Sequence, residues 1–236
     1  MRKALVFAII FIVVSSVSAL DMTAGGEWFG EVSYDGGTFD GGLGPSALSG
    51  VSIFFGLKYA EIFVALSGGT TEPDTIRFGW LELIHEPEEK ENFPAFNIGL
   101  LGKFPVSSSE KVRLSPVLGM DYEICVSGKR YSMLYTNSES VNKKSKASDF
   151  NRLWFRFGLN ADYGWNDYRY DMSNGYNSGI YFRFGILYGI GLKNKYENDL
   201  MREVKEKGGF ADINLRHSLG IRLGLGFVGN KIKDRG

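Results

Sequence analysis

The feature that most constrains this chain is a strict two-residue alternation of side-chain polarity near its C-terminus. One face consists of eight residues, of which all but His217 are apolar: Ile213, Leu215, His217, Leu219, Ile221, Leu223, Leu225 and Phe227. The other face consists of Asp212, Asn214, Arg216, Ser218, Gly220, Arg222, Gly224 and Gly226. Successive side chains of a β-strand point to opposite sides, so this pattern predicts a long strand between two different environments.

The same alternation recurs upstream and sets the expected number of strands. It is clear over residues 112–126, 153–165 and 180–192, and weaker over 28–35, 49–57, 61–84 and 96–104. The total is eight if 61–84 is one long strand interrupted by Gly68, Gly69, Thr70, Thr71 and Pro73. If that stretch is a turn, the count becomes nine, which would leave the two termini on opposite sides of the membrane. Nearly all bacterial single-chain barrels have an even count, which favours eight.

The composition of the two faces indicates which of them meets the interior. Glycine contributes 31 of 236 residues, and the polar faces interleave it with Arg, Asp and Glu. Glycine and paired charges fit a narrow lumen, whereas large aliphatic and aromatic side chains suit contact with lipid. We therefore predict an all-β fold, an eight-stranded antiparallel up-and-down transmembrane β-barrel. The alternative is a soluble exported lipid-binding barrel, whose outer face would be rich in Lys, Glu, Ser and Thr.

The N-terminus indicates export. Arg2 and Lys3 precede an apolar run over residues 4–14, which is too short to span a bilayer, and Ala19 suits cleavage before Leu20. We expect a signal peptide over 1–19 and an outer-membrane β-barrel over 20–236, located in the bacterial outer membrane. No cysteine lies at the junction for lipid attachment, and the single Cys125 permits no internal disulfide.

The strand order assigns the connections to two sides. Three are expected on the periplasmic side, at 58–61, 106–111 and 166–177; four longer ones are expected outside, at 36–47, 85–95, 128–149 and 194–209. Within the last, Tyr196, Leu200 and Val204 lie four apart, which fits either a short amphipathic helix on the rim or a solvated loop. Expected partners are outer-membrane lipids, the barrel-assembly machinery and, at the outer loops, an extracellular ligand of unknown kind.

One segment carries a family resemblance. The stretch Gly99-Leu100-Leu101-Gly102-Lys103-Phe104-Pro105-Val106, followed by a polar turn and by Leu114-Ser115-Pro116-Val117-Leu118-Gly119-Met120-Asp121-Tyr122, resembles small spirochaetal outer-membrane barrels. These proteins are loosely similar to the eight-stranded OmpW/OprG and OmpX types. The resemblance implies fold and location, and it carries over no catalytic residue. Such barrels end in an aromatic residue, so Phe227 is expected to serve as an internal version of that signal or the assembly code differs.

Charged residues on the polar faces form the candidate site. The predicted lumen charge network contains Arg113, Asp121, Glu123, Arg152, Arg156, Asp162, Arg183, Arg216 and Arg222, with Lys58 and Lys103 expected to join it. The set fits a charge-lined path or pocket, or else a plug of ion pairs. The plug is favoured because an eight-stranded interior is barely wide enough for its own side chains.

Signals for catalysis are weak. The only histidines are His85, expected in an outer loop, and His217, expected on the lipid face; they support neither a zinc site nor a triad. The spacing Gly224, Gly226, Gly229 fits a dinucleotide fingerprint but lacks the following helix. With zero formal net charge, nothing attracts nucleic acid. We predict no enzyme and no cofactor, but a structural or surface-interaction role, with a narrow pore for small solutes as the alternative.

Overall fold

The structure is a computed structural model. It describes residues 22–35, 46–57, 59–71, 75–78, 81–84, 94–109, 111–126, 131–135, 140–144, 146–165, 170–171, 175–176, 179–206 and 215–228. The predicted signal peptide, Lys58 and His85 lie outside these residues, so the cleavage site stays a prediction.

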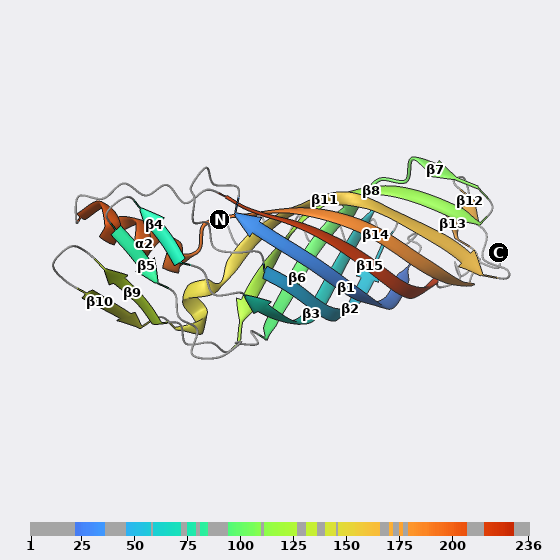
Figure 1. Cartoon of the computed structure of the whole chain (residues 1–236). Helices are drawn as coiled ribbons and strands as arrows, with labels where there is room; N and C mark the ends of the chain where they lie inside the picture. Colours follow the sequence, from blue (N-terminus) through green and yellow to red (C-terminus); the bar gives the residue numbers. More distant parts are fainter. Residues whose placement is uncertain are drawn as a thin grey trace, which may run out of the picture.

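Eight long antiparallel strands form a closed barrel, as predicted. Each strand pairs with the next along the chain, and the last pairs with the first (Figure 1). The strands are β1 (Thr23–Asp35), β2 (Ser46–Gly56), β3 (Ala60–Thr71), β6 (Ala95–Lys103), β8 (Val112–Cys125), β11 (Arg152–Trp165), β14 (Gly179–Gly191) and β15 (Arg216–Val228). Closure leaves no long edge of the barrel wall unpaired, which removes a template for aggregation.

The register fixes the shape of the barrel. Paired residues lead from Thr23 around the wall and return to β1 at Ser33, ten residues further along, by way of Gly56, Glu61, Leu101, Gly119, Arg156, Gly189 and Ser218. This stagger requires strands inclined by roughly 40° to the barrel axis, in the usual range for such barrels. It also decides which inward side chains lie at the same level, although their strands are far apart in sequence.

The two ends of the barrel differ, as expected for short inner turns and long outer loops. One end carries β7 (Ser107–Ser108), β12 (Tyr170–Asp171) and β13 (Gly175–Tyr176) (Figure 1). The opposite end carries β4 (Thr75–Phe78), β5 (Leu81–Ile84), β9 (Tyr131–Tyr135), β10 (Ser140–Lys144), the 3-10 helix η2 (Ala147–Phe150) and helix α2 (Lys195–Glu206). No helix in the described part of the chain is long and apolar enough to cross a membrane.

Three features of the outer end correct or complete the sequence-based prediction. The expected single strand over 61–84 is wrong: β3 ends at Thr71, and β4 and β5 form a hairpin in a separate four-stranded sheet with β9 and β10. The barrel still has eight strands, because this hairpin is not part of the barrel wall. The β9–β10 hairpin within the expected loop 128–149 was not predicted. The amphipathic segment after Asn194 is a helix, α2, rather than a solvated loop.

Candidate functional site

The wall of the barrel separates two chemically different faces. Large apolar side chains on its outside are between about two-fifths and two-thirds exposed, among them Val51, Ile53, Phe55, Ile62, Leu66, Leu118, Phe157, Phe184, Leu223 and Phe227. Two aromatic side chains near one end, Tyr163 and Trp165, are also exposed. Inward positions are buried and mostly polar or charged. The polarity of an ordinary soluble protein is therefore inverted.

Inward glycines make room for large side chains in the lumen. A β-carbon at Gly99 would fall against the ring of Phe63, and one at Gly226 would fall against the ring of Tyr181. Phe54, Phe63, Leu101 and Tyr181 form most of a small apolar cluster inside the barrel. Glycine on the inner wall thus lets rings and long charged side chains cross the barrel.

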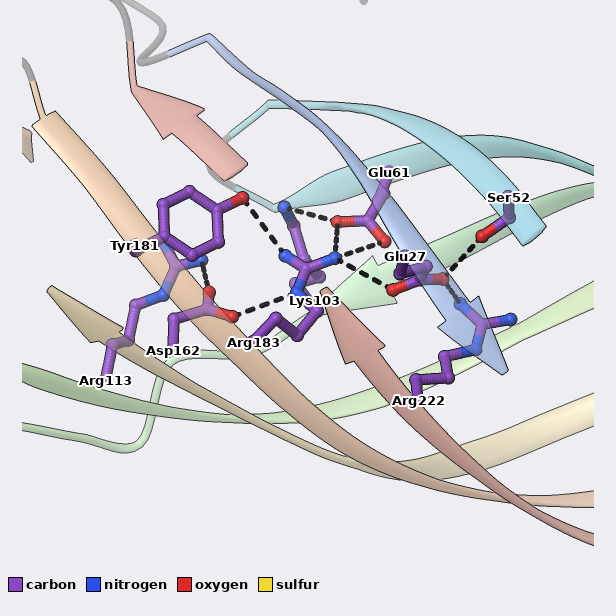
Figure 2. Close-up of polar contacts among 9 residues, drawn as sticks. All are labelled: Glu27, Ser52, Glu61, Lys103, Arg113, Asp162, Tyr181, Arg183 and Arg222. Atoms are coloured by element: carbon purple, nitrogen blue, oxygen red, sulfur yellow. Dashed lines mark hydrogen bonds and ion pairs between the residues drawn. The ribbon is translucent and has the colours of Figure 1, made fainter. Parts of the chain in front are cut away.

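Arg183 is the centre of the ion-pair network in one half of the lumen. Its Nη1 donates to both carboxylate oxygens of Glu61, at 2.9 and 2.8 Å, and its Nε donates to Asp162 at 2.9 Å (Figure 2). Its guanidinium also lies 4.1 Å from the centre of the Phe54 ring. The side chain is fully buried, so its charge is compensated entirely by protein groups.

Further cations extend this network on both sides. Lys103 Nζ donates to Glu61 at 3.2 Å, and Arg113 Nη2 donates to Asp162 at 2.5 Å (Figure 2). On the other side, Arg222 Nη1 and Ser52 Oγ donate to one oxygen of Glu27, at 2.8 and 2.9 Å. These residues come from β1, β2, β3, β6, β8, β11, β14 and β15, so every long strand contributes to the cross-links.

A second ion-pair group lies nearer the outer end. Arg156 Nε donates to both oxygens of Asp121, at 3.1 and 3.2 Å, and its Nη1 donates to Glu31 at 2.9 Å. The same Nη1 lies 2.8 Å from Ser218 Oγ, and the guanidinium lies 4.6 Å from the Trp154 ring centre. A single arginine here joins β1, β8 and β15 to β11.

The outermost charged pair links the barrel to α2. Arg152, at the start of β11, donates through Nη2 to Glu197 of α2 at 2.5 Å, and both side chains are buried. Glu123 lies next to it and accepts a hydrogen bond of 3.0 Å from the Trp154 indole. The loop helix is thus attached to the inside of the barrel mouth.

The structure brings most of the predicted network into the lumen. Arg113, Asp121, Arg152, Arg156, Asp162, Arg183 and Arg222 are buried inside, as is Lys103. Glu123 points inward but is only partly buried, and Arg216 occupies the outer end of β15 with intermediate exposure. Cys125 is also partly buried, and its thiol lies 4.0 Å from Glu123.

Four carboxylates of the network were missing from the predicted set: Glu27, Glu31, Glu61 and Glu197. Glu27 and Glu31 follow the inward parity of β1, and that parity was a usable signal, because Trp28, Gly30 and Val32 alternate with them. Glu61 is the inward residue near the start of β3. Glu197 lies in a loop helix, where strand parity carries no information.

One cavity inside the described part of the barrel is small. A cavity of about 20 Å³ lies between the two ion-pair groups and is lined partly by Glu31, Asn97, Asp121 and Arg222. Such a volume holds about one water molecule. Among the described residues, no three acidic, histidine or cysteine side chains are grouped so as to hold a metal ion. His217 lies outside the wall, partly buried, 2.5 Å from the Tyr188 hydroxyl.

Comparisons with known proteins give structural likenesses only. No protein-family model matches the sequence, and no curated protein matches it significantly. Solved structures that are similar include Neisserial surface protein A (NspA), with 10% identity over 87% of this chain and 96% of that one and a TM-score of 0.41. The N-terminal β-barrel domain of Pseudomonas aeruginosa OprF has 10% identity, coverage of 88% and 97%, and a TM-score of 0.37.

A third similar structure is Ail, the attachment invasion locus protein of Yersinia pestis. It shows 8% identity over 89% of this chain and 99% of that one, with a TM-score of 0.37. The closed eight-stranded barrel of this chain is defined by its own strand pairings. The resemblance of residues 97–122 to spirochaetal barrels stays a prediction.

Proposed function

We propose that this chain is an integral outer-membrane protein whose sealed barrel holds its outer loops at the cell surface, in a structural or surface-interaction role. The observation that carries the proposal is the inverted barrel, with an ion-pair network across the lumen and exposed apolar side chains around the outside. A lipid bilayer matches such an outer surface, whereas soluble monomers rarely expose large contiguous apolar patches.

The soluble lipid-binding alternative fits poorly. Such a barrel needs an apolar interior to receive an acyl chain, but Arg113, Asp162 and Arg183 fill one half of this lumen and Arg156 crosses the other. Placing a lipid chain there would require breaking buried ion pairs, which is strongly destabilising. The proposed location in the membrane avoids this cost.

The pore alternative and an enzymatic role have less support than a sealed scaffold. A pore needs a continuous open path, whereas the cavity between the ion-pair groups has room for about one water molecule. We therefore propose that the interior cross-links and seals the barrel.

Two measurements test the proposal. Membrane fractionation with gel migration before and after boiling should show a heat-modifiable band in the outer-membrane fraction. Planar-bilayer recordings of the purified protein should show no conductance above that of the same protein boiled before addition. A soluble, non-shifting protein would refute the membrane location, and reproducible channel steps would refute the sealed lumen and favour the pore.

A further inference from the structure

The first turn of α2 is built around Glu197. Asn194 precedes the helix, and its Oδ1 accepts a hydrogen bond of 2.9 Å from the Glu197 amide; Glu197 Oε2 accepts one of 2.9 Å from the Asn194 amide. This reciprocal pair is a capping box, which satisfies two amides at the helix start. One oxygen of the Glu197 carboxylate is therefore held by its own helix.

The other oxygen is held by the barrel. Glu197 Oε1 accepts from Arg152 Nη2 at 2.5 Å, and the side chains are only 2% and 4% exposed. Arg152 Nη1 donates to the backbone carbonyl of Leu192 at 3.2 Å, and its guanidinium lies 5.6 Å from the Trp154 ring centre. The barrel mouth thus presents a guanidinium that is fixed in position and shielded from water, which is a receptor for an oxyanion.

The other described contacts of α2 lie near the surface or involve one ring. Tyr196 is buried with its ring 4.9 Å from that of Phe150. Lys195 pairs with Asp149 at 2.9 Å while 70% exposed, and Arg202 pairs with Asp199 and Glu206 on the exposed side. Exposed pairs of this kind contribute little to docking. Among the described residues of α2, Glu197 makes the buried ionic attachment.

We propose that Arg152 is an anion-binding site that Glu197 occupies from within the chain, so that α2 acts as an autoinhibitory lid on the outer mouth. An external oxyanion, a carboxylate, phosphate or sulfate, takes the position of the Glu197 carboxylate when the helix lifts. This inference rests on the proposed surface role, because the site lies at the barrel end that we expect to face the cell exterior.

The tether limits which ligands compete. A group linked by a short chain acts at an effective concentration of about millimolar or more, so a single free anion is outcompeted by Glu197. A ligand with several oxyanionic groups gains additional contacts and overcomes the tether. The site therefore selects multiply charged anionic ligands over simple buffer anions.

The test uses the full chain in detergent micelles with inorganic sulfate as the probe. The variant Glu197→Gln removes the internal carboxylate, and the double variant with Arg152→Gln also removes the receptor. Glu206→Gln at the exposed end of α2 is the matched control. Sulfate affinity is measured by calorimetry at constant ionic strength set with chloride, and hydrogen exchange reports on residues 195–206.

Glu197→Gln should bind sulfate at least about tenfold more tightly than the unmodified chain, since the tethered competitor is gone. Its α2 amides should exchange faster while those of β14 and β15 stay unchanged, and Glu206→Gln should behave like the unmodified chain. Equal sulfate affinity in Glu197→Gln and the double variant would overturn the anion site, and unchanged exchange in α2 would overturn the lid. Heat-modifiable migration and conductance test the proposed function separately. A failure of the proposed function can therefore be told apart from a failure of the anion site.

Discussion

Strand β14 meets two different environments within a single residue step. Arg183 points inward, is fully buried and binds two carboxylates, whereas its neighbours Phe182 and Phe184 point outward and are 38% and 47% exposed. A soluble protein would place these side chains the other way round. The comparison shows that burial and polarity are separate properties in this fold, because the charged side chains are enclosed by the wall and the apolar ones lie on its outside.

The comparison also explains why charges are stable at only some positions. An inward charge is neutralised by carboxylates from distant strands, such as Glu61 of β3, whereas an outward charge at the same level would lie among exposed apolar side chains. The same residue type should therefore have opposite effects at positions 183 and 184.

The largest expected effect follows from removing the central cation. Arg183→Met leaves Glu61 and Asp162 buried with fewer compensating charges, so we expect a loss of about 3–5 kcal/mol in the free energy of unfolding. Urea unfolding in lipid vesicles, followed by the folded band on unboiled gels, measures this loss. The control Arg202→Met removes an exposed cation and should change little. Equal stability of the two variants would mean that the inner ion pairs do not hold the wall together.

A charge on the outward face gives the next largest effect. Phe184→Arg should cost about 2–4 kcal/mol if the position lies near the middle of the bilayer, because hydrocarbon does not solvate the guanidinium. The same urea titration measures this change, with Phe184→Leu as the apolar control. Full tolerance of the arginine would contradict a lipid-facing surface and support a soluble barrel.

Substituting alanine for glycine compares the two faces of the wall without introducing a charge. At the inward Gly158, a β-carbon would collide with the backbone carbonyl of Ile186, whereas at the outward Gly68 it would meet nothing within 4 Å. Gly158→Ala should therefore cost about 1–3 kcal/mol through overpacking. Gly68→Ala should stay within about 0.5 kcal/mol of the unmodified chain. Similar values for both, measured by the same unfolding assay, would refute the assignment of faces.

The smallest effect concerns an ion pair beyond the wall. Hydrogen bonds from the Lys146 amide and the Lys195 ammonium hold the pKa of Asp149 below its ordinary value, and the partner raises the pKa of Lys195. A depressed carboxyl pKa stabilises the fold above the unfolded value and loses this contribution as the pH falls through about 4. Protection factors at residues 146–150, which correct for the intrinsic pH dependence of amide exchange, should decrease slightly between pH 5 and 3, and Asp149→Asn should abolish that decrease. An identical decrease in the Asn variant would exclude Asp149 as its source.

Individual strands and their facing were predictable because each depends on local parity. The leucines of β15 define one face of the strand, so Arg216 and Arg222 must lie on the opposite face. The partners were not predictable, because Arg183 and Glu61 are 122 residues apart and meet only through the register of the closed barrel. The hairpin of β4 and β5 was misread for a related reason. Its residues alternate like a wall strand, and only pairing with β9 takes them out of the barrel.

The sequence by itself determined that the chain alternates between two environments and that the glycine-rich charged face needs a confined interior. Those properties are encoded residue by residue in side-chain polarity and size. The tertiary structure alone decided how the charges pair, with Arg183 and Arg156 at the centres of two ion-pair groups and Glu197 brought in from a loop helix. Closure of the barrel with a ten-residue stagger sets which inward side chains lie at the same height. That stagger is a property of all eight strands together.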